Sequence, residues 1–226
     1  MKAEIVTHFR LRNTYRLIPS RFPSVGILDR VAAPDDLDAV IELESWTNDR
    51  ISEELGILHR LPQEEWVVGQ PMATVVMASF CHPRPEGGRF NTGDRGAWYA
   101  ATTLDTAHAE VVHHRAQELE EIGVFETHLE MRAYLADFRT DFHDLRAGEG
   151  TAPPSLYSKT SYTASQRLAE ELLTQGSNGV VYDSVRLPGG TCLACFRPPL
   201  VKNVRASAHY EYRWSGSRNP AVRRLG

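Results

Sequence analysis

Cysteine is scarce in this chain, and that scarcity limits the classes of protein open to it. Three cysteines stand among 226 residues. They are too few and too unevenly spaced for a disulfide framework, which favours a reducing compartment. The stretch from Met1 to Arg16 also lacks the apolar core of a signal peptide. We therefore expect a cytoplasmic protein.

Long apolar runs and an excess of positive charge are missing as well. The most apolar stretch, WVVGQPMATVVMASFC from Trp66, is interrupted by Gly69, Gln70 and Pro71 and is too short to span a bilayer. The 25 Lys and Arg residues are outnumbered by 29 Asp and Glu residues. The short apolar run gives no reason to expect a membrane partner. Because nucleic-acid binders usually carry a basic excess, we expect no direct nucleic-acid partner either. The basic tail from Arg218 to Arg224 is interpreted as a frayed end.

Several common catalytic motifs are absent too. The chain has no GxGxxG and no GxxxxGK[ST], which argues against Rossmann and P-loop phosphate sites. It has no GxSxG, which argues against a hydrolase nucleophile. HAEVVHH lacks the histidine pair of HExxH, so no metal site is expected there. Cys192 and Cys195 have CxxC spacing, and Cys81-His82 could complete a zinc site. However, Cys192 and Cys195 lie within a predicted strand, which would point their thiols to opposite faces of the sheet. We therefore expect buried structural cysteines.

The elements that are present alternate irregularly. The pattern predicts strands over residues 9–18, 72–80, 97–102 and 125–135, and on both sides of a loop over 184–190. It predicts helices over 34–46, 48–61, 107–122 and 161–176, the third capped by Asp105-Thr106. Loops are expected over 81–88 and 148–155. Because strands and helices do not follow a regular βαβ order, the predicted fold class is α+β.

A carboxylate at position 110 falls on a partly apolar face of the third predicted helix. Ala107 and Val111 share that face with Glu110. Burying an unpaired carboxylate is costly, so Glu110 is expected to be paired or to take part in chemistry. The alternative is an ordinary first-turn glutamate favoured by the helix dipole.

Arg89 and Tyr99 precede that helix and are further candidates. Arg89 follows Gly87-Gly88, a pair that allows a positive φ or a close approach of backbone to a ligand. Its guanidinium suits a phosphate or carboxylate, and the alternative is a surface salt bridge. Tyr99 has small neighbours that leave one ring face free for stacking on a planar ligand. Its alternative is a core tyrosine with a satisfied hydroxyl.

Ser184 lies directly after a predicted strand in VVYDSVRLPGG. A serine there is a ligand hydroxyl, a turn former or a nucleophile. The last role is poorly supported, because no Ser–His–Asp order can be read from the chain.

Taken together in order, these blocks resemble one family. YRLIPSRF, GGRFN, WYAATTLDTAHAEVVHHR and YTASQRLAEELLTQGSNGVVYDSVRLPGG are similar to the RES domain family, named for its arginine, glutamate and serine. The likeness runs from Tyr15 to about Trp214. It places Arg89, Tyr99, Glu110 and Ser184 on the family's site positions and Arg16 on its early arginine. It also implies an ADP-ribosyltransferase-like mixed sheet with flanking helices, as a single domain over residues 1–226.

The resemblance carries expectations about activity and partners. RES proteins include toxins of bacterial toxin–antitoxin pairs that are held inactive by an Xre-type helix-turn-helix antitoxin, and a homodimer is a further expectation. The implied substrate is NAD, cleaved at its nicotinamide–ribose bond by phosphate or water, with no metal. Glu110 would stabilise the developing positive charge, Arg89 and Arg16 would hold the pyrophosphate, Tyr99 would face the nicotinamide, and Ser184 would bind a hydroxyl or the carboxamide.

Two alternatives and one departure accompany this resemblance. The protein could instead transfer ADP-ribose from NAD to another protein. It could also be a silent binding module in which Arg89 and Glu110 form an internal ion pair. The departure is a helical insert at about residues 35–62, which short members of the family lack.

Overall fold

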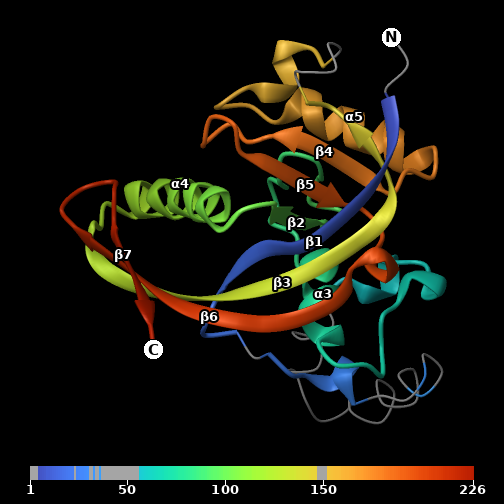
Figure 1. The fold of residues 1–226 in the computed structure, drawn as a ribbon, viewed down its shortest axis with the longest axis horizontal. Helices are drawn as coiled ribbons and strands as arrows, with labels where there is room; N and C mark the ends of the chain where they lie inside the picture. The colour runs from blue at the N-terminus through green and yellow to red at the C-terminus, as the bar shows by residue number, and fades with distance from the viewer. Residues whose placement is uncertain (1–4, 23, 31–32, 34–35, 37–55, 147–151) are drawn as a thin grey trace.

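The computed structural model describes residues 5–22, 24–30, 33, 36, 56–146 and 152–226. The strands are β1 (Ile5–Pro19), β2 (Trp98–Ala101), β3 (Glu126–Asp144), β4 (Gly179–Asp183), β5 (Thr191–Cys195), β6 (Lys202–Ser215) and β7 (Ala221–Leu225). The helices of the described residues are α3 (Ala73–Cys81), α4 (Leu104–Ile122) and α5 (Thr163–Thr174). Figure 1 shows the long curved strands β1, β3 and β6 sweeping across the middle of the molecule, with the short strands β4 and β5 and helix α5 above them and helix α3 below.

The strands form one mixed sheet in the order β1-β2-β5-β4-β3-β6-β7, in which β1 also pairs with β3. That extra pairing closes five of the strands into a ring. The β3–β4 pair is parallel and every other pair is antiparallel. The α+β class and the mixed sheet predicted from the sequence are confirmed.

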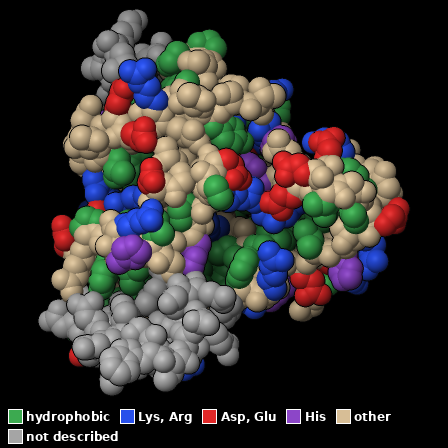
Figure 2. All heavy atoms as spheres, turned by 180° about the vertical axis from the view of Figure 1, so that it is seen from behind, with side chains coloured by type: hydrophobic (Ala, Val, Ile, Leu, Met, Phe, Trp, Pro, Cys, Tyr) green, Lys and Arg blue, Asp and Glu red, His purple; other side chains and the backbone are tan. Residues whose placement is uncertain are grey.

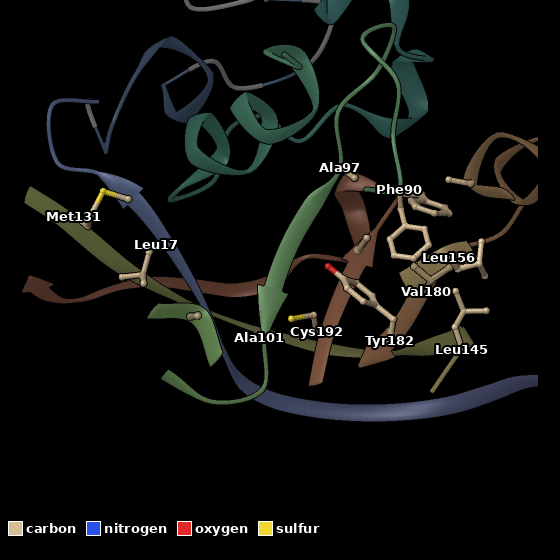
Figure 3. Packing of buried hydrophobic residues seen from close by; sticks show 14 of the residues in the cluster. Leu17, Phe90, Ala97, Ala101, Met131, Leu145, Leu156, Val180, Tyr182 and Cys192 are labelled. Carbon is tan, nitrogen blue, oxygen red and sulfur yellow. The ribbon is translucent and has the colours of Figure 1, made fainter. Parts of the chain in front are cut away.

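Two apolar cores lie on opposite faces of the short strands. The α3 core, on the side of helix α3, includes Leu28, Val76, Phe80, Trp98, Phe138, Phe142, Leu193 and Cys195. The α4 core, on the side of helices α4 and α5, includes Leu17, Phe90, Ala107, Leu119, Tyr182, Cys192, Tyr212 and Trp214. Figure 3 shows part of the α4 core, with Tyr182 and Cys192 reaching in from the paired strands β4 and β5. As predicted, Cys192 and Cys195 face opposite sides of the sheet.

The strand predicted over residues 72–80 is wrong, because this segment forms helix α3. Seven of its nine residues are buried, so its apolar run meets protein on nearly every side. A short run without alternation fits a buried strand or a buried helix equally well. Ala, Met and the surrounding α3 core favour the helix here, despite the β-branched residues.

Other boundaries differ from the sequence-based prediction by smaller amounts. The cap of α4 is Thr103, whose hydroxyl accepts from the Thr106 amide at 3.3 Å, rather than Asp105-Thr106. The tail interpreted as frayed carries strand β7, paired with β6. The strand predicted at 125–135 is confirmed and continues to Asp144.

The predicted helical insert falls mainly on residues that the structure does not describe. Within 56–62 it shows a 3₁₀ turn over Leu58–Arg60. The rest of the insert prediction, and part of the loop predicted at 148–155, lie outside the described residues. The assignment of the whole chain to one domain stays a prediction. None of the described helices combines the length and apolarity needed to cross a membrane.

Candidate functional site

The side chains of Glu110, on α4, and Ser184, in the loop between β4 and β5, are hydrogen-bonded to each other. Ser184 donates its hydroxyl to Glu110 Oε1 at 2.6 Å. The thiol of Cys192 lies 3.7 Å from the same oxygen. Glu110 is half-buried on the face that carries Ala107 and Val111, so the predicted placement of this carboxylate on a partly apolar face is confirmed.

The β4–β5 loop is built around Ser184. Its hydroxyl oxygen accepts from the amides of Arg186 at 3.1 Å and Leu187 at 3.0 Å, which makes it a turn former as well as a partner of Glu110. Gly190 closes the loop against α4, since a Cβ there would lie 2.6 Å from the Thr106 hydroxyl. The Ser184–Glu110 hydrogen bond and the close packing of Gly190 on Thr106 hold the loop against the first turns of α4.

Arg89 is a buried cation with 8% of its surface exposed. Its Nη1 donates to the carbonyls of Leu156 at 2.9 Å and Ser158 at 3.0 Å. Its guanidinium carbon lies 4.6 Å from the centre of the Tyr162 ring. The described residues include no carboxylate paired with Arg89, neither Glu110 nor any other. Among the described residues, this arginine therefore forms neither a surface salt bridge nor the predicted ion pair with Glu110.

Tyr99 supports the turn that carries Arg89. Its hydroxyl accepts from the Phe90 amide at 2.7 Å and donates to Asn91 Oδ1 at 2.8 Å. Burial raises the pKa of Tyr99 above its ordinary value, which keeps the phenol protonated. The glycines serve the same turn: Gly87 has a φ of +75°, and a Cβ on Gly88 would lie 2.8 Å from the Tyr99 hydroxyl. The close approach expected of this pair is thus to Tyr99, and stacking of its ring on a ligand stays a prediction.

Arg16 lies on the other face of the sheet. Its register partner Tyr134 and its stacking partner Trp98, at 4.9 Å, both belong to the α3 core. Its contact with Tyr99 is from Nη1 to the backbone carbonyl at 3.0 Å. Burial lowers the pKa of Arg16 to about 10. The structure thus joins Ser184 to Glu110 and Tyr99 to the turn of Arg89. Glu110, Tyr99 and Arg89 all interact electrostatically with Tyr182, whereas Arg16 contacts the backbone of strand β2 from the opposite face.

Sequence reasoning missed two residues of this site. Tyr162 packs on Arg89, and Cys192 contacts Glu110. Burial and the charge of Glu110 raise the pKa of the Cys192 thiol above its ordinary value, so it stays a neutral donor. Alternation along β5 predicts that Cys192 faces away from Cys195. It does not reveal that α4 covers that face. Within the described residues, no group of three His, Cys, Asp or Glu side chains is placed to hold a metal.

His114, one turn beyond Glu110, gives a prediction about pH. Burial, with the nearby charges of His113 and Arg84, lowers the pKa of His114 to about 3. The unfolded chain therefore binds a proton that the folded chain excludes. The resulting stability is complete above the ordinary histidine pKa of about 6.5 and is lost as the pH falls toward the folded value. We expect His114→Gln to flatten the loss of stability between about pH 7 and about pH 5, measured by urea unfolding.

The matched control is His59→Gln at an exposed position. It should keep the pH dependence of the parent protein. An unchanged slope in the His114 variant would contradict the prediction.

The fold and site define an α+β protein with a serine-held carboxylate and a buried arginine that pairs with no carboxylate of the described residues. The RES domain model matches residues 57–215, and the chain belongs to that family. It is 30% identical over 206 residues to the uncharacterized protein y4oC of Sinorhizobium fredii (strain NBRC 101917 / NGR234), covering 90% of this chain and 84% of that protein. In fold it is similar to the toxin in the crystal structure of the M. tuberculosis MbcT–MbcA toxin–antitoxin complex. The TM-score is 0.51 at 12% identity, with 92% of this chain and 87% of that chain covered.

Proposed function

We propose that the chain is the toxin of a toxin–antitoxin pair and that it degrades NAD by cleaving the nicotinamide–ribose bond. Membership of the RES family and the fold shared with a chain of a toxin–antitoxin complex support the first part. The observation that carries the second part is the pair of Glu110 and Ser184 beside Arg89, a buried cation without a carboxylate among the described residues.

The proposed chemistry needs an anion next to the reacting sugar. Departure of nicotinamide leaves an oxocarbenium-like ribose, as in glycoside cleavage. Glu110 would stabilise that charge, and the Ser184 hydroxyl holds the carboxylate in place at 2.6 Å. The nicotinamide–ribose bond breaks with its electron pair going to the nicotinamide nitrogen. The ribose carbon then bonds to phosphate or water, which loses a proton. No metal ion takes part in the proposed reaction.

A buried guanidinium needs a counter-charge. Carbonyls of Leu156 and Ser158 occupy only Nη1 of Arg89 among the hydrogen bonds of the described chain. A ligand phosphate would supply both the charge and acceptors for the remaining N–H groups. Arg89 therefore suits the pyrophosphate of NAD, with Tyr99 and Tyr162 beside it to face planar parts of the ligand.

The test is release of nicotinamide from NAD by the purified chain, with and without inorganic phosphate. Release that depends on phosphate indicates phosphorolysis, and release indifferent to phosphate indicates hydrolysis. Transfer of labelled ADP-ribose to a polypeptide would instead favour the protein-modifying alternative. Absence of release, transfer and thermal stabilisation by NAD would leave a silent binding module. Co-purification with an Xre-type helix-turn-helix protein would test the proposed partner.

Removing the Ser184 hydroxyl should impair this reaction more than it impairs folding. In Ser184→Ala, Glu110 loses the hydroxyl that donates a hydrogen bond to its carboxylate. The backbone amides of Arg186 and Leu187 also lose the hydroxyl oxygen that accepts from them. We expect nicotinamide release to fall roughly 10- to 100-fold, because a displaced catalytic group reacts poorly. The control is Ser161→Ala, an exposed serine that contacts Thr163. Equal rates in the two variants would contradict the role given to Ser184.

A further inference from the structure

Two buried side-chain nitrogens near the candidate site lack hydrogen-bond partners. One is Nε2 of His113 on α4, and the other is Nε of Arg186 on the β4–β5 loop. Elsewhere on its guanidinium, Arg186 Nη2 donates to the Lys159 carbonyl at 3.0 Å and approaches the Tyr162 hydroxyl at 3.5 Å. Leaving such groups buried and unpaired is costly, so each calls for a partner that the described residues do not supply.

The two nitrogens belong to segments that are held against each other. The Ser184–Glu110 hydrogen bond fixes the β4–β5 loop on α4. His113 lies three residues beyond Glu110, which places it on the same helix face. Arg186 lies two residues beyond Ser184. Its positive charge contributes to lowering the pKa values of both His113 and His114, in keeping with this placement.

The surroundings carry an excess of positive charge. Three arginines near the two histidines are paired with glutamates: Arg84 and Arg115 share Glu118, Arg84 also lies 4.0 Å from Glu86, and Arg218 pairs with Glu120. Arg89 and Arg186 pair with no carboxylate of the described residues. Both of these arginines contact Tyr162, Arg89 over its ring and Arg186 at its hydroxyl.

We call Arg89, His113 and Arg186 the basic corner. Arg89 and Arg186 are joined through Tyr162, and the charges of both contribute to lowering the pKa of His113. Figure 2 shows a hollow between the lobe that carries α4 and β7 and the rest of the molecule, with Lys or Arg and His side chains around it.

We infer that the basic corner binds a phosphate-type oxyanion, present either as inorganic phosphate or as a phosphate group of a dinucleotide. Two guanidinium forks and a neutral imidazole N–H match the several acceptor oxygens of a phosphate. Such a ligand would pair both orphaned nitrogens and neutralise the charge that α4 leaves unbalanced. The inference assigns Arg186 and His113 as ligand-binding residues. It deepens the proposed function, on which the dinucleotide source rests.

The test measures binding by the full chain, separately for inorganic phosphate and for NAD, by calorimetry at constant ionic strength. Arg186→Gln should weaken binding about 10- to 100-fold, as expected for loss of a charge-assisted hydrogen bond. His113→Phe, which removes the imidazole nitrogens, provides a second variant should the first fail to fold. The control is Arg167→Gln, which removes one charge from an exposed residue of α5 that pairs with Glu171.

The outcomes separate the sources. Weaker phosphate binding in both corner variants supports a site for inorganic phosphate, and weaker NAD binding alone supports a site for the dinucleotide phosphates. Unchanged affinity for both, or a loss no larger than in the Arg167 variant, overturns the inference even if nicotinamide is released. Conversely, Arg186-dependent phosphate binding without nicotinamide release would leave this site standing and refute the proposed function.

Discussion

Replacing Glu110 with glutamine is expected to lower the rate of nicotinamide release on the order of 10²- to 10³-fold, the range seen when a group that stabilises transition-state charge is lost. Glutamine has nearly the same shape and keeps an oxygen that can accept from Ser184, which donates to Glu110 at 2.6 Å. The contact that fixes the β4–β5 loop is therefore preserved. What disappears is the negative charge that would face the oxocarbenium-like ribose.

The experiment compares initial rates of nicotinamide release and thermal unfolding of the same preparations. Glu121→Gln is the matched control, because it makes the same chemical change on an exposed part of α4. It should release nicotinamide at the parental rate. A Glu110 variant that retains full activity would remove this carboxylate from the mechanism. One that loses activity together with its cooperative unfolding would indicate a structural role instead.

The two elements that carry Tyr99 and Glu110, β2 and α4, were predictable because their signals are local. WYAA is a short β-type stretch, and the face of Ala107, Glu110 and Val111 follows from helical periodicity. Periodicity fixes which residues share a face. It does not fix what packs on that face, so the contacts of Glu110 with Ser184 and Cys192 became visible only in three dimensions.

The surroundings of Arg89 show the same limit. Its Nη1 partners are backbone carbonyls of Leu156 and Ser158, and every residue type has such a carbonyl. No pattern of side chains in the sequence could therefore predict these carbonyl partners of Arg89. Arg16 was predictable only in part. Alternation along β1 predicts that Arg16 and Leu17 face opposite sides of the sheet. Only the β1–β3 register shows that the Arg16 side chain is the one that faces the α3 core.

The errors in the predicted secondary structure also have physical causes. The helix over residues 73–81 was predicted as a strand because protein surrounds nearly all of it, and a uniformly apolar run carries no period that distinguishes the two. By contrast, β6 ends with Tyr210, Tyr212 and Trp214 buried at every second position. That period-two signal was available in the sequence and also argues that the residues after it continue the sheet.

The largest effect on stability is expected at Glu65, a residue outside the candidate site. This residue is 7% exposed, and its carboxylate pairs with both Arg95 and Arg197. Arg95 also donates to the Phe196 carbonyl at 2.6 Å, and Arg197 to the carbonyls of Ser177 and Leu173 at 3.3 and 3.2 Å. One carboxylate thus ties the 3₁₀ turn over Gln63–Glu65 to the end of β5 and to α5.

In Glu65→Ala, two largely buried guanidinium groups lose their counter-charge while their other contacts hold them in place. Breaking a buried ion pair from one side costs about 3–5 kcal/mol. For a chain of this size, 1 kcal/mol lowers Tm by roughly 2–4 °C, so we expect a fall of about 6–20 °C in thermal unfolding. The neighbouring Glu64 is exposed, and Glu64→Ala should stay within about 0.5 kcal/mol of the parent. Glu65→Gln should fall between the two, because its amide oxygen can still accept from one arginine while the charge is gone. If the alanine variants at 64 and 65 unfold at the same temperature, the two arginines are sufficiently stabilised by their carbonyl partners, and Glu65 is not what holds these segments together.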